Sequence, residues 1–568
     1  MAATIQKIFV VPPIAVARLG GSSTPQDAYQ WVESPNPRSK GETTIAPDWS
    51  LVVQSDGTVE PVMPESLSLR DGALIRPVCP FFELWALVGD SSADQSTWKE
   101  VPLTPAVLAA AGASERDLAI TVDARNFKVS RRTRDTALRY GTFPPLQVQG
   151  DHHAPVPILA SSPPGVPASR RMIPAAQSIP FGSFQVLRSR PQAAPGSSPW
   201  AKVTDNRPLV DVEVVRFRFT PASGHFYGPP DAAALHKVDG GKSFAPVAPE
   251  RAFLNPDAGW AGVNVNVAAG APDAPQDTYD GADVPTNRSL GVVDDTCEAR
   301  IKVTLTLSTP AKRSLTTSAA VFVAPPDFAP DRRPFLSLAD ELNDRAADGE
   351  ARTRLLSESD RDAWIEDLFE RIYETVSLLN LDRWRGEKAI RLTGGRLAPP
   401  IANDHTSEPT RAMGGADALR NRSFALSAVG PEIKLPLTTQ ARTRHRMLSD
   451  LDGLRDFVAQ NKGRLLTLVR RSFEAERGET TDGIGTTTMR MPPFMRNSNG
   501  GPLTLAAWQY DLLMAWVQAL ETRPAPAGPV DAVAHRAARP MSDAAVRRRG
   551  TVLARIARVQ RGGSPDGQ

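Results

Sequence analysis

The two cysteines are the first side chains to consider, because a thiol can act as a nucleophile, a metal ligand or a cross-linking group. They are Cys79 and Cys297, and neither has a second Cys or a His at metal-ligand spacing. Two thiols cannot build a disulfide framework. The cysteine usage therefore suits a reducing compartment, and a cytoplasmic location is expected.

The densest group of ionisable side chains outside the C-terminal tail is Asp151-His152-His153. A metal site or a general base there would need a further ligand from the fold, for which His225, His236 and Asp294 are candidates. Adjacent histidines on an extended segment point to opposite faces and do not easily share one metal ion. Solvent-exposed loop histidines are therefore the favoured interpretation, and no metal is predicted.

Two adjacent carboxylates, Asp294-Asp295, could share one proton and serve as an acid–base pair. Sequence neighbours diverge along a strand and cap well in a turn, so a structural role is favoured. The segment Asp239-Gly240-Gly241-Lys242-Ser243 contains the Gly-Lys-Ser of a phosphate-binding loop. The first glycine of that motif would fall at His236 and no strand precedes it, so no phosphate site is predicted.

Four separated blocks carry a family resemblance. They are IFVVPPIAVARLG over residues 8–20, GVVDD over 291–295, VFVAPPDFAPD over 321–331 and LAAWQYDLLMAW over 505–516. Together and in this order they resemble the cysteine tryptophylquinone-dependent amino-acid oxidases, the lysine-epsilon-oxidase and glycine-oxidase group. The chain departs from that family at Pro12-Pro13, where the family has a His-Pro pair, and at Thr296-Cys297-Glu298, where small residues with Asp-Gly are usual.

The resemblance implies an oxidase whose cofactor is made from a Cys and a Trp of the chain itself. Such a quinone presents an electrophilic carbonyl that a primary amine attacks. In the family both residues lie beyond the last block, whereas here no Cys or Trp follows Trp516. A relocated cross-link of Cys79 with Trp85 is disfavoured, and Trp508 and Trp516 are expected in a helical core. The expected cofactor is none, and catalytic residues stay unassigned.

The composition bounds the architecture that must position these residues. The chain has 568 residues, of which 41% are hydrophobic and 23% charged, with 52 Pro and 40 Gly. This predicts two or more domains with long irregular connections. The net charge is only +3, and arginines gather between Arg536 and Arg561, so a nucleic-acid-binding body is disfavoured. Neither a secretion signal nor a transmembrane segment is expected.

The part of the chain before residue 333 is predicted to be rich in strands. Extended apolar runs occur at 5–18, 50–53, 73–88, 118–122, 210–219, 299–307 and 320–323. Pro12-Pro13 has no N–H to donate, so its run is expected at a sheet edge or a bulge. The Pro-, Gly- and Ala-rich stretches 154–200 and 255–290 are expected to be surface excursions. Residues 321–331 should leave the sheet through a rigid proline turn, with Phe322 in the core.

After Pro334 the apolar residues recur at helical spacing, and helices are predicted over 336–347, 358–382, 447–475 and 504–521. In the second of these, Trp364, Leu368, Ile372, Val376 and Leu379 form one stripe. Ser542-Asp543 could cap a last basic helix that runs to about residue 559. That tail suits docking to an acidic partner, although a solvated end is the favoured interpretation.

The predicted fold class is α+β: a β-rich body over 1–333 with long loops, a mainly helical region over 334–523, and a Pro-rich spacer with a basic, partly disordered tail over 524–568. The favoured function is that of a divergent family relative that has lost the quinone and serves as a companion subunit, binding module or scaffold. An active oxidoreductase on a small primary amine or amino acid, with an unlocated cofactor, is the alternative. The third possibility is an unrelated binding or structural protein whose matches to the family blocks are accidental.

Overall fold

A computed structural model describes residues 4–33, 43–126, 145–189, 212–227, 293–337 and 504–521, with short gaps inside these ranges, and single positions between 340 and 487. These residues belong to two compact units. The described part of the first unit lies within Met1–Gln30 and Ala46–Phe328, and that of the second within Trp31–Ile45 and Ala329–Arg555. The boundary predicted at residue 333 stays a prediction.

The first unit contains a six-stranded antiparallel sheet in the order β1-β9-β15-β14-β13, with β10 also paired to β9. The strands are β1 (Thr4–Val11), β9 (Phe81–Gly89), β10 (Lys99–Pro102), β13 (Val156–Ala160), β14 (Ile179–Val186) and β15 (Arg216–Pro221). Alternate side chains of β9, at Phe82, Leu84 and Ala86, are fully buried. This is the period of two that places one face of a strand in a core.

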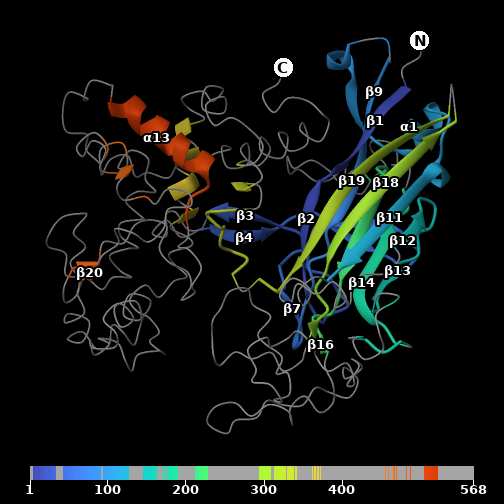
Figure 1. Ribbon diagram of the computed structural model, residues 1–568, viewed down its shortest axis with the longest axis horizontal. Coiled ribbons are helices and arrows are strands. Elements are labelled where there is room, and N and C mark those ends of the chain that lie inside the picture. Colours follow the sequence, from blue (N-terminus) through green and yellow to red (C-terminus); the bar gives the residue numbers. More distant parts are fainter. Residues whose placement is uncertain are drawn as a thin grey trace, which may run out of the picture. The chain divides into compact units, whose positions relative to one another are not determined.

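A second sheet of five strands has the order β12-β11-β18-β19-β2. Its strands are β2 (Ile14–Arg18), β11 (Leu118–Arg125), β12 (Leu146–Gln149), β18 (Glu298–Leu307) and β19 (Arg313–Ala324). All neighbours are antiparallel except β2, which runs parallel to β19. Figure 1 shows β11, β18, β19 and β2 side by side in this sheet.

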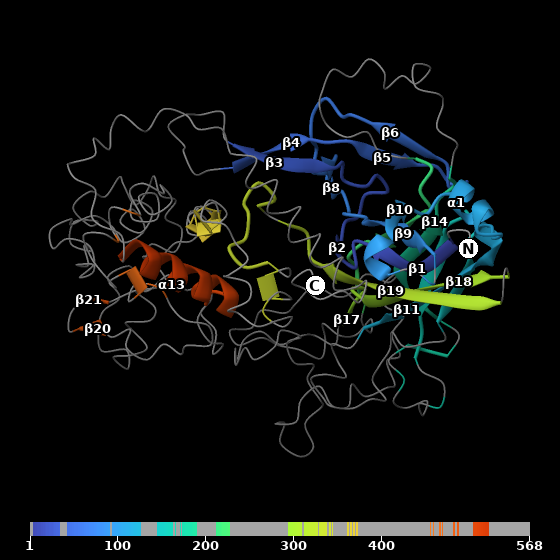
Figure 2. The same cartoon turned by 90° about the horizontal axis from the view of Figure 1, so that it is seen from above.

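The core of the first unit lies between the two sheets. Figure 2 shows β9, β10 and β14 in one layer and β11, β18 and β19 in the other. One hydrophobic cluster joins Phe82 and Phe217 of the first sheet to Ile120 and Val303 of the second. The rings of Phe82 and Phe217 stack with centroids 5.4 Å apart. Burial of such apolar surface is the main force that holds the layers together.

The first unit also contains shorter elements. They are the strand pairs β5 (Ser50–Val53) with β6 (Val59–Val62), β7 (Arg70–Asp71) with β8 (Leu74–Ile75) and β16 (Phe226–Tyr227) with β17 (Val293–Asp294), and the helix α1 (Pro105–Ala110). A further pair, β3 (Tyr29–Glu33) with β4 (Thr43–Pro47), falls mostly in the second unit. The Thr104 side chain accepts a hydrogen bond from the amide of Val107 and so caps α1.

The second unit contains the helix α13 (Ala507–Glu521) and the short pair β20 (Thr481–Asp482) with β21 (Thr486–Thr487). The described positions between residues 361 and 372 are also helical. Their side chains Ile365, Phe369 and Ile372 share a hydrophobic cluster with Leu513 of α13. Within the described residues, no helix is long and apolar enough to cross a membrane.

Several sequence predictions agree with these elements. Pro12-Pro13 separates β1 from β2, and each of these strands ends the order of its sheet, so the edge interpretation is confirmed. The helix predicted over 504–521 is α13. The other predicted helices are described only at separate positions, and 255–290 and the tail after residue 521 lie outside the described residues.

Other predictions about strands are wrong. The stretch 154–200 was expected to be a surface excursion, but it supplies β13 and β14, and β14 lies inside the six-stranded sheet. Its prolines are tolerated because Pro157 lies on the edge strand β13 and Pro180 lies beside a register shift between β13 and β14. The strand predicted over 210–219 begins only at Arg216.

The predicted core position of Phe322 is also wrong. Val321 is fully buried on β19, whereas Phe322 is 38% exposed. Adjacent residues on a strand point to opposite faces, so the buried Val321 directs the Phe322 ring outward. The strand ends at Ala324, as the following Pro325-Pro326 requires.

Candidate functional site

The Asp294-Asp295 pair lies at a corner of the first unit where two distant segments meet. Asp294 ends β17, which pairs with β16 so that Phe226 stands opposite Asp294 and Tyr227 opposite Val293. The chain then continues into β18 of the five-stranded sheet. The short ladder therefore brings the Asp295 carboxylate against His225, which precedes β16.

Two hydrogen bonds join Asp295 and His225, one between backbone groups and one from a backbone amide to a carboxylate oxygen. The amide of Asp295 donates to the carbonyl of His225 at 3.2 Å, and the amide of His225 donates to Oδ2 of Asp295 at 3.0 Å. Asp295 is fully buried, and its Oδ1 atom has no hydrogen-bond partner within the described residues. A buried carboxylate with one unsatisfied oxygen is costly unless it is protonated.

Asp294 has different partners. Its Oδ1 accepts a hydrogen bond from the amide of Thr296 at 3.3 Å and another from the Thr296 hydroxyl. The side-chain amide of the buried Asn126 donates to the carbonyls of Asp294 at 3.0 Å and Thr296 at 2.8 Å. Asp294 therefore closes a turn, as favoured from its position in the sequence. The two carboxylates diverge and do not form one shared acid–base pair.

The electrostatics of the corner distinguish Asp295 from an ordinary surface carboxylate. Burial raises the pKa of Asp295 to about 6, the hydrogen bond from the His225 amide opposes the rise, and the nearby charge of Asp294 adds to it. A carboxylic acid with such a pKa can accept or donate a proton near neutral pH. Asp295 is thus the described side chain best suited to proton transfer.

Within the described residues, Asp151, His152 and His153 are not joined by a further metal ligand. Asp151 pairs with Arg116 at 3.0 Å on the surface, and His152 is exposed as expected. His153 is half-buried rather than exposed, because its carbonyl accepts a hydrogen bond from the buried Gln185 at 2.9 Å. Among the described residues no three His, Cys, Asp or Glu side chains could hold a metal ion. His236 and the Gly-Lys-Ser segment lie outside those residues.

The two thiols are buried in the first unit. Burial raises the pKa of Cys79 to about 11, although the nearby Arg218 lowers it. Burial likewise raises the pKa of Cys297 far above its usual range, and its thiol faces the carbonyl of Phe181. Both thiols are therefore protonated near neutral pH. The absence of a cross-link between Cys79 and Trp85 stays a prediction.

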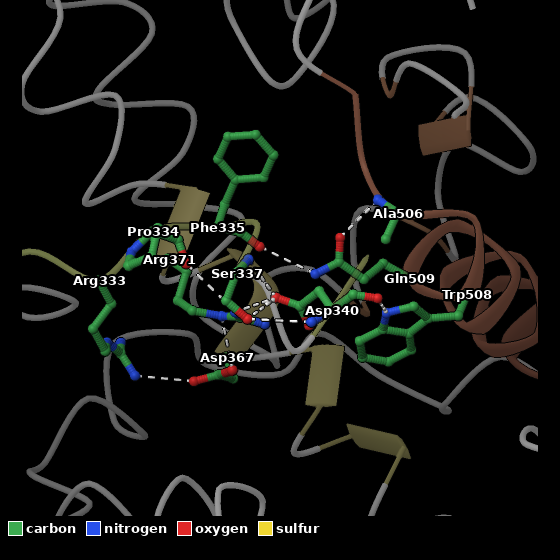
Figure 3. Close-up of polar contacts among 10 residues, drawn as sticks. All are labelled: Arg333, Pro334, Phe335, Ser337, Asp340, Asp367, Arg371, Ala506, Trp508 and Gln509. Carbon is green, nitrogen blue, oxygen red and sulfur yellow. Dashed lines mark hydrogen bonds and ion pairs between the residues drawn. The ribbon is translucent and has the colours of Figure 1, made fainter. Parts of the chain in front are cut away.

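A second polar cluster is buried in the second unit (Figure 3). Asp367 lies between Arg333 at 2.9 Å and Arg371 at 3.0 Å, and Arg371 also contacts Asp340 at 3.1 Å. These four side chains are each at most 11% exposed. Two cations and two anions balance one another, which is the condition under which buried charges are tolerated.

Residues in and next to this cluster form hydrogen bonds with the first residues of α13. The indole nitrogen of Trp508 donates to the carbonyl of Asp340 at 3.0 Å, and the side chain of Gln509 donates to the carbonyl of Phe335 at 3.1 Å. Both oxygens of the Asp344 carboxylate accept hydrogen bonds from α13, one from the amide of Ala507 and one from that of Trp508, each at 2.7 Å. A carboxylate at this end satisfies free amides and complements the helix dipole.

Trp508 and Trp516 are core residues, as predicted. Trp508 packs edge-on against Trp364 with ring centroids 4.9 Å apart, and both indoles of α13 are less than a tenth exposed. The charged cluster was not predicted, because only the apolar stripe of that helical segment was considered. The spacing of Asp367 and Arg371 at i, i+4 was the available signal. For Asn126, no local signal pointed to its role.

Comparisons with known proteins give a structural likeness only. No family model and no curated protein matches the sequence. The structure is similar to that of L-Lys epsilon-oxidase from Marinomonas mediterranea in its Schiff base intermediate with L-Lys, at 16% identity and a TM-score of 0.39, covering 94% of this chain and 63% of that one. Another structure of that enzyme matches at 15% identity and 0.37, with the same coverage. The chain thus spans less than two thirds of the length of these proteins.

Proposed function

We propose that this chain is a divergent relative of the tryptophylquinone amino-acid oxidases that has kept the scaffold, lost the self-derived quinone, and serves as a companion subunit or binding module. The proposal rests on the four sequence blocks, on the burial of their side chains, and on the chemistry of the two thiols.

Several residues of the blocks are buried inside one unit or the other. Val10 and Ala17 of the first block and Val321 of the third are buried in the first unit. The second block supplies the Asp294-Asp295 corner, and the fourth forms α13, where Trp508, Leu513 and Trp516 are buried. Buried side chains at such positions stabilise a fold, and a fold alone does not establish an activity.

The burial of the two thiols, which suppresses their thiolate forms, is the single observation on which we base the proposed loss of the quinone. A cross-link of this type needs a thiolate, and the thiolate form is suppressed at both Cys79 and Cys297 by burial. Both thiols are buried in the described structure. On this ground we favour a binding role over amine oxidation for the chain.

Intact mass and redox staining of the purified chain test this proposal. The mass should equal that of the sequence, allowing for removal of Met1, and the protein should neither absorb in the visible nor stain in a quinone redox-cycling assay. Added oxygen and lost hydrogen mapped to a peptide with a Cys–Trp cross-link would overturn the proposal.

The partner we propose is an acidic protein that binds the arginine-rich tail between Arg536 and Arg561. Arginines with few acidic neighbours favour such docking, and attraction of this kind weakens with salt. A chain shortened by residues 524–568 should lose an acidic partner that full-length protein retains at low salt. Equal retention of the partner by the shortened and the full-length chain would exclude the tail as the binding site.

An oxidoreductase acting on a small primary amine or amino acid is the second candidate, and Asp295 is the observation that favours it. Its raised pKa, about 6, suits a general base that removes a proton near neutral pH. Release of hydrogen peroxide from a panel of amines and amino acids by the wild-type chain, abolished in Asp295→Asn, would establish this activity in place of the binding role.

A further inference from the structure

Arg218 carries a positive charge for which the described residues provide no acidic partner. It lies on β15 between Phe217 and Phe219, whose rings are buried in the core, so its side chain projects from the opposite face of the six-stranded sheet. There the side chain is half-buried, and its Nε atom is buried without a hydrogen-bond partner. Its described side-chain hydrogen bond runs from Nη2 to Oε1 of Gln185 at 3.1 Å, and this acceptor is neutral.

A carboxylate on the same face of the sheet, that of Glu83, is already engaged. Its Oε1 atom accepts a hydrogen bond from Nε of the buried Arg216 at 2.8 Å, and its Oε2 atom accepts one from the indole nitrogen of Trp85 at 3.1 Å. The thiol of Cys79 lies near Arg218 but is neutral at pH 7, because burial raises its pKa to about 11. An arginine stays protonated at that pH, so the charge of Arg218 is not balanced within the described residues.

The guanidinium of Arg218 is held in place by a buried neighbour. Gln185 of β14 stands opposite Arg218 in the sheet and is 2% exposed. Its side-chain nitrogen donates to the carbonyls of Gln54 at 3.1 Å and His153 at 2.9 Å, which leaves its Oε1 atom to accept from Arg218. A cation fixed in this way loses little conformational entropy when it binds a ligand, and this favours affinity.

An unbalanced, half-buried cation is costly unless an anion binds to it. Gln185 accepts from only one N–H group of Arg218, and the planar fork of a guanidinium matches two oxygens of a carboxylate or phosphate group. Phe81 stands opposite Arg218 on β9 and is also half-buried, so an apolar surface adjoins the cation. We propose that Arg218 and Phe81 form a binding site for a small organic anion, a carboxylate or a phosphate ester. The site goes beyond the proposed function, because it uses residues of the first unit and not the arginine-rich tail.

Isothermal titration calorimetry of the full-length protein at low ionic strength, with benzoate and with phenyl phosphate as probes, tests the site. Saturable binding of at least one probe is expected, and the probe that binds identifies the class of anion. Arg218→Met should weaken this binding by about tenfold or more, because it removes the charged donors. Arg116→Met is the control, since Arg116 is an 85% exposed arginine of the same unit that pairs with Asp151, and it should leave the affinity unchanged.

Two results would overturn the proposal. One is the absence of saturable heat with both probes. The other is equal affinity of the wild type and Arg218→Met, which would assign the binding to other cations such as those of the tail. Arg218→Met should fold, because it removes no ion pair within the described residues, and circular dichroism checks this. If it does not fold, Arg218→Lys decides the question, since lysine keeps the charge but not the planar fork. Weaker binding by Arg218→Lys supports the site, and affinity equal to wild type rejects it.

Discussion

The indole nitrogen of Trp516 donates a 2.7 Å hydrogen bond to Oδ1 of Asp362, whose other carboxylate oxygen contacts the guanidinium of Arg455. Trp516 is 3% exposed, and it comes from one of the four blocks that carry the family resemblance. A side chain of this size and position packs the core of the second unit and also satisfies a charged group. Packing and this hydrogen bond explain the position of Trp516 within the block.

We expect Trp516→Phe to lower the free energy of unfolding of the second unit by about 1–3 kcal/mol, because it removes a donor from a partly buried carboxylate and reduces the packed volume. Urea unfolding followed by far-ultraviolet circular dichroism measures the change. Gln518→Ala on the exposed side of α13 is the control and should stay within about 0.5 kcal/mol of wild type. Equal stability of both variants would show that the indole is not buried.

Arg371→Met should destabilise the second unit by about 3–5 kcal/mol, because it leaves Asp340 without its cation and removes one of the two cations of Asp367. Arg361→Met is a matched change at a half-buried arginine of the same helical segment. No ion pair of Arg361 occurs within the described residues, and we expect a loss of less than about 1 kcal/mol. Comparable losses in the two variants would reject the buried network.

Val321→Ala and Phe322→Ala compare the two faces of β19. Val321 is fully buried, so its truncation should cost about 2 kcal/mol. Phe322 is partly exposed, and removal of its larger ring should cost less, about 1 kcal/mol or below. Thermal unfolding of the two variants under the same conditions gives the order. The reverse order would mean that Phe322 faces the core.

Cys79 and Cys297 should resist thiol reagents in the native protein at pH 8, because burial raises the pKa of both thiols well above that pH. Reaction with a chromogenic disulfide should therefore be slow in buffer and complete in guanidinium chloride. Ser314→Cys places a thiol at an exposed position of β19 and should react rapidly. Rapid reaction of the wild-type chain in buffer would show that the thiols are accessible.

Local sequence patterns were sufficient to predict elements in which one regular face is buried along the whole length. The strict alternation of residues 299–307 produces β18, and the helical spacing of 504–521 produces α13 with two buried tryptophans. Pro12-Pro13 separates β1 from β2 at the edges of two sheets, because neither proline can donate to a ladder. Each of these outcomes depends on the backbone and the nearest neighbours in sequence.

Tertiary structure alone decided which distant segments share an environment. The pairing of Ile14 with Ala320 joins segments far apart in the sequence. The place of β14 inside a sheet and the direction of Phe322 likewise depend on which strands pair and which face is covered. The chemistry of Asp295 was settled in the same way. Its pair with Asp294 is visible in the sequence, but its pKa depends on burial and on the amide of His225, 70 positions away. Burial in a turn and hydrogen bonds between distant segments leave no periodic pattern in the sequence, so residue spacing could not reveal them.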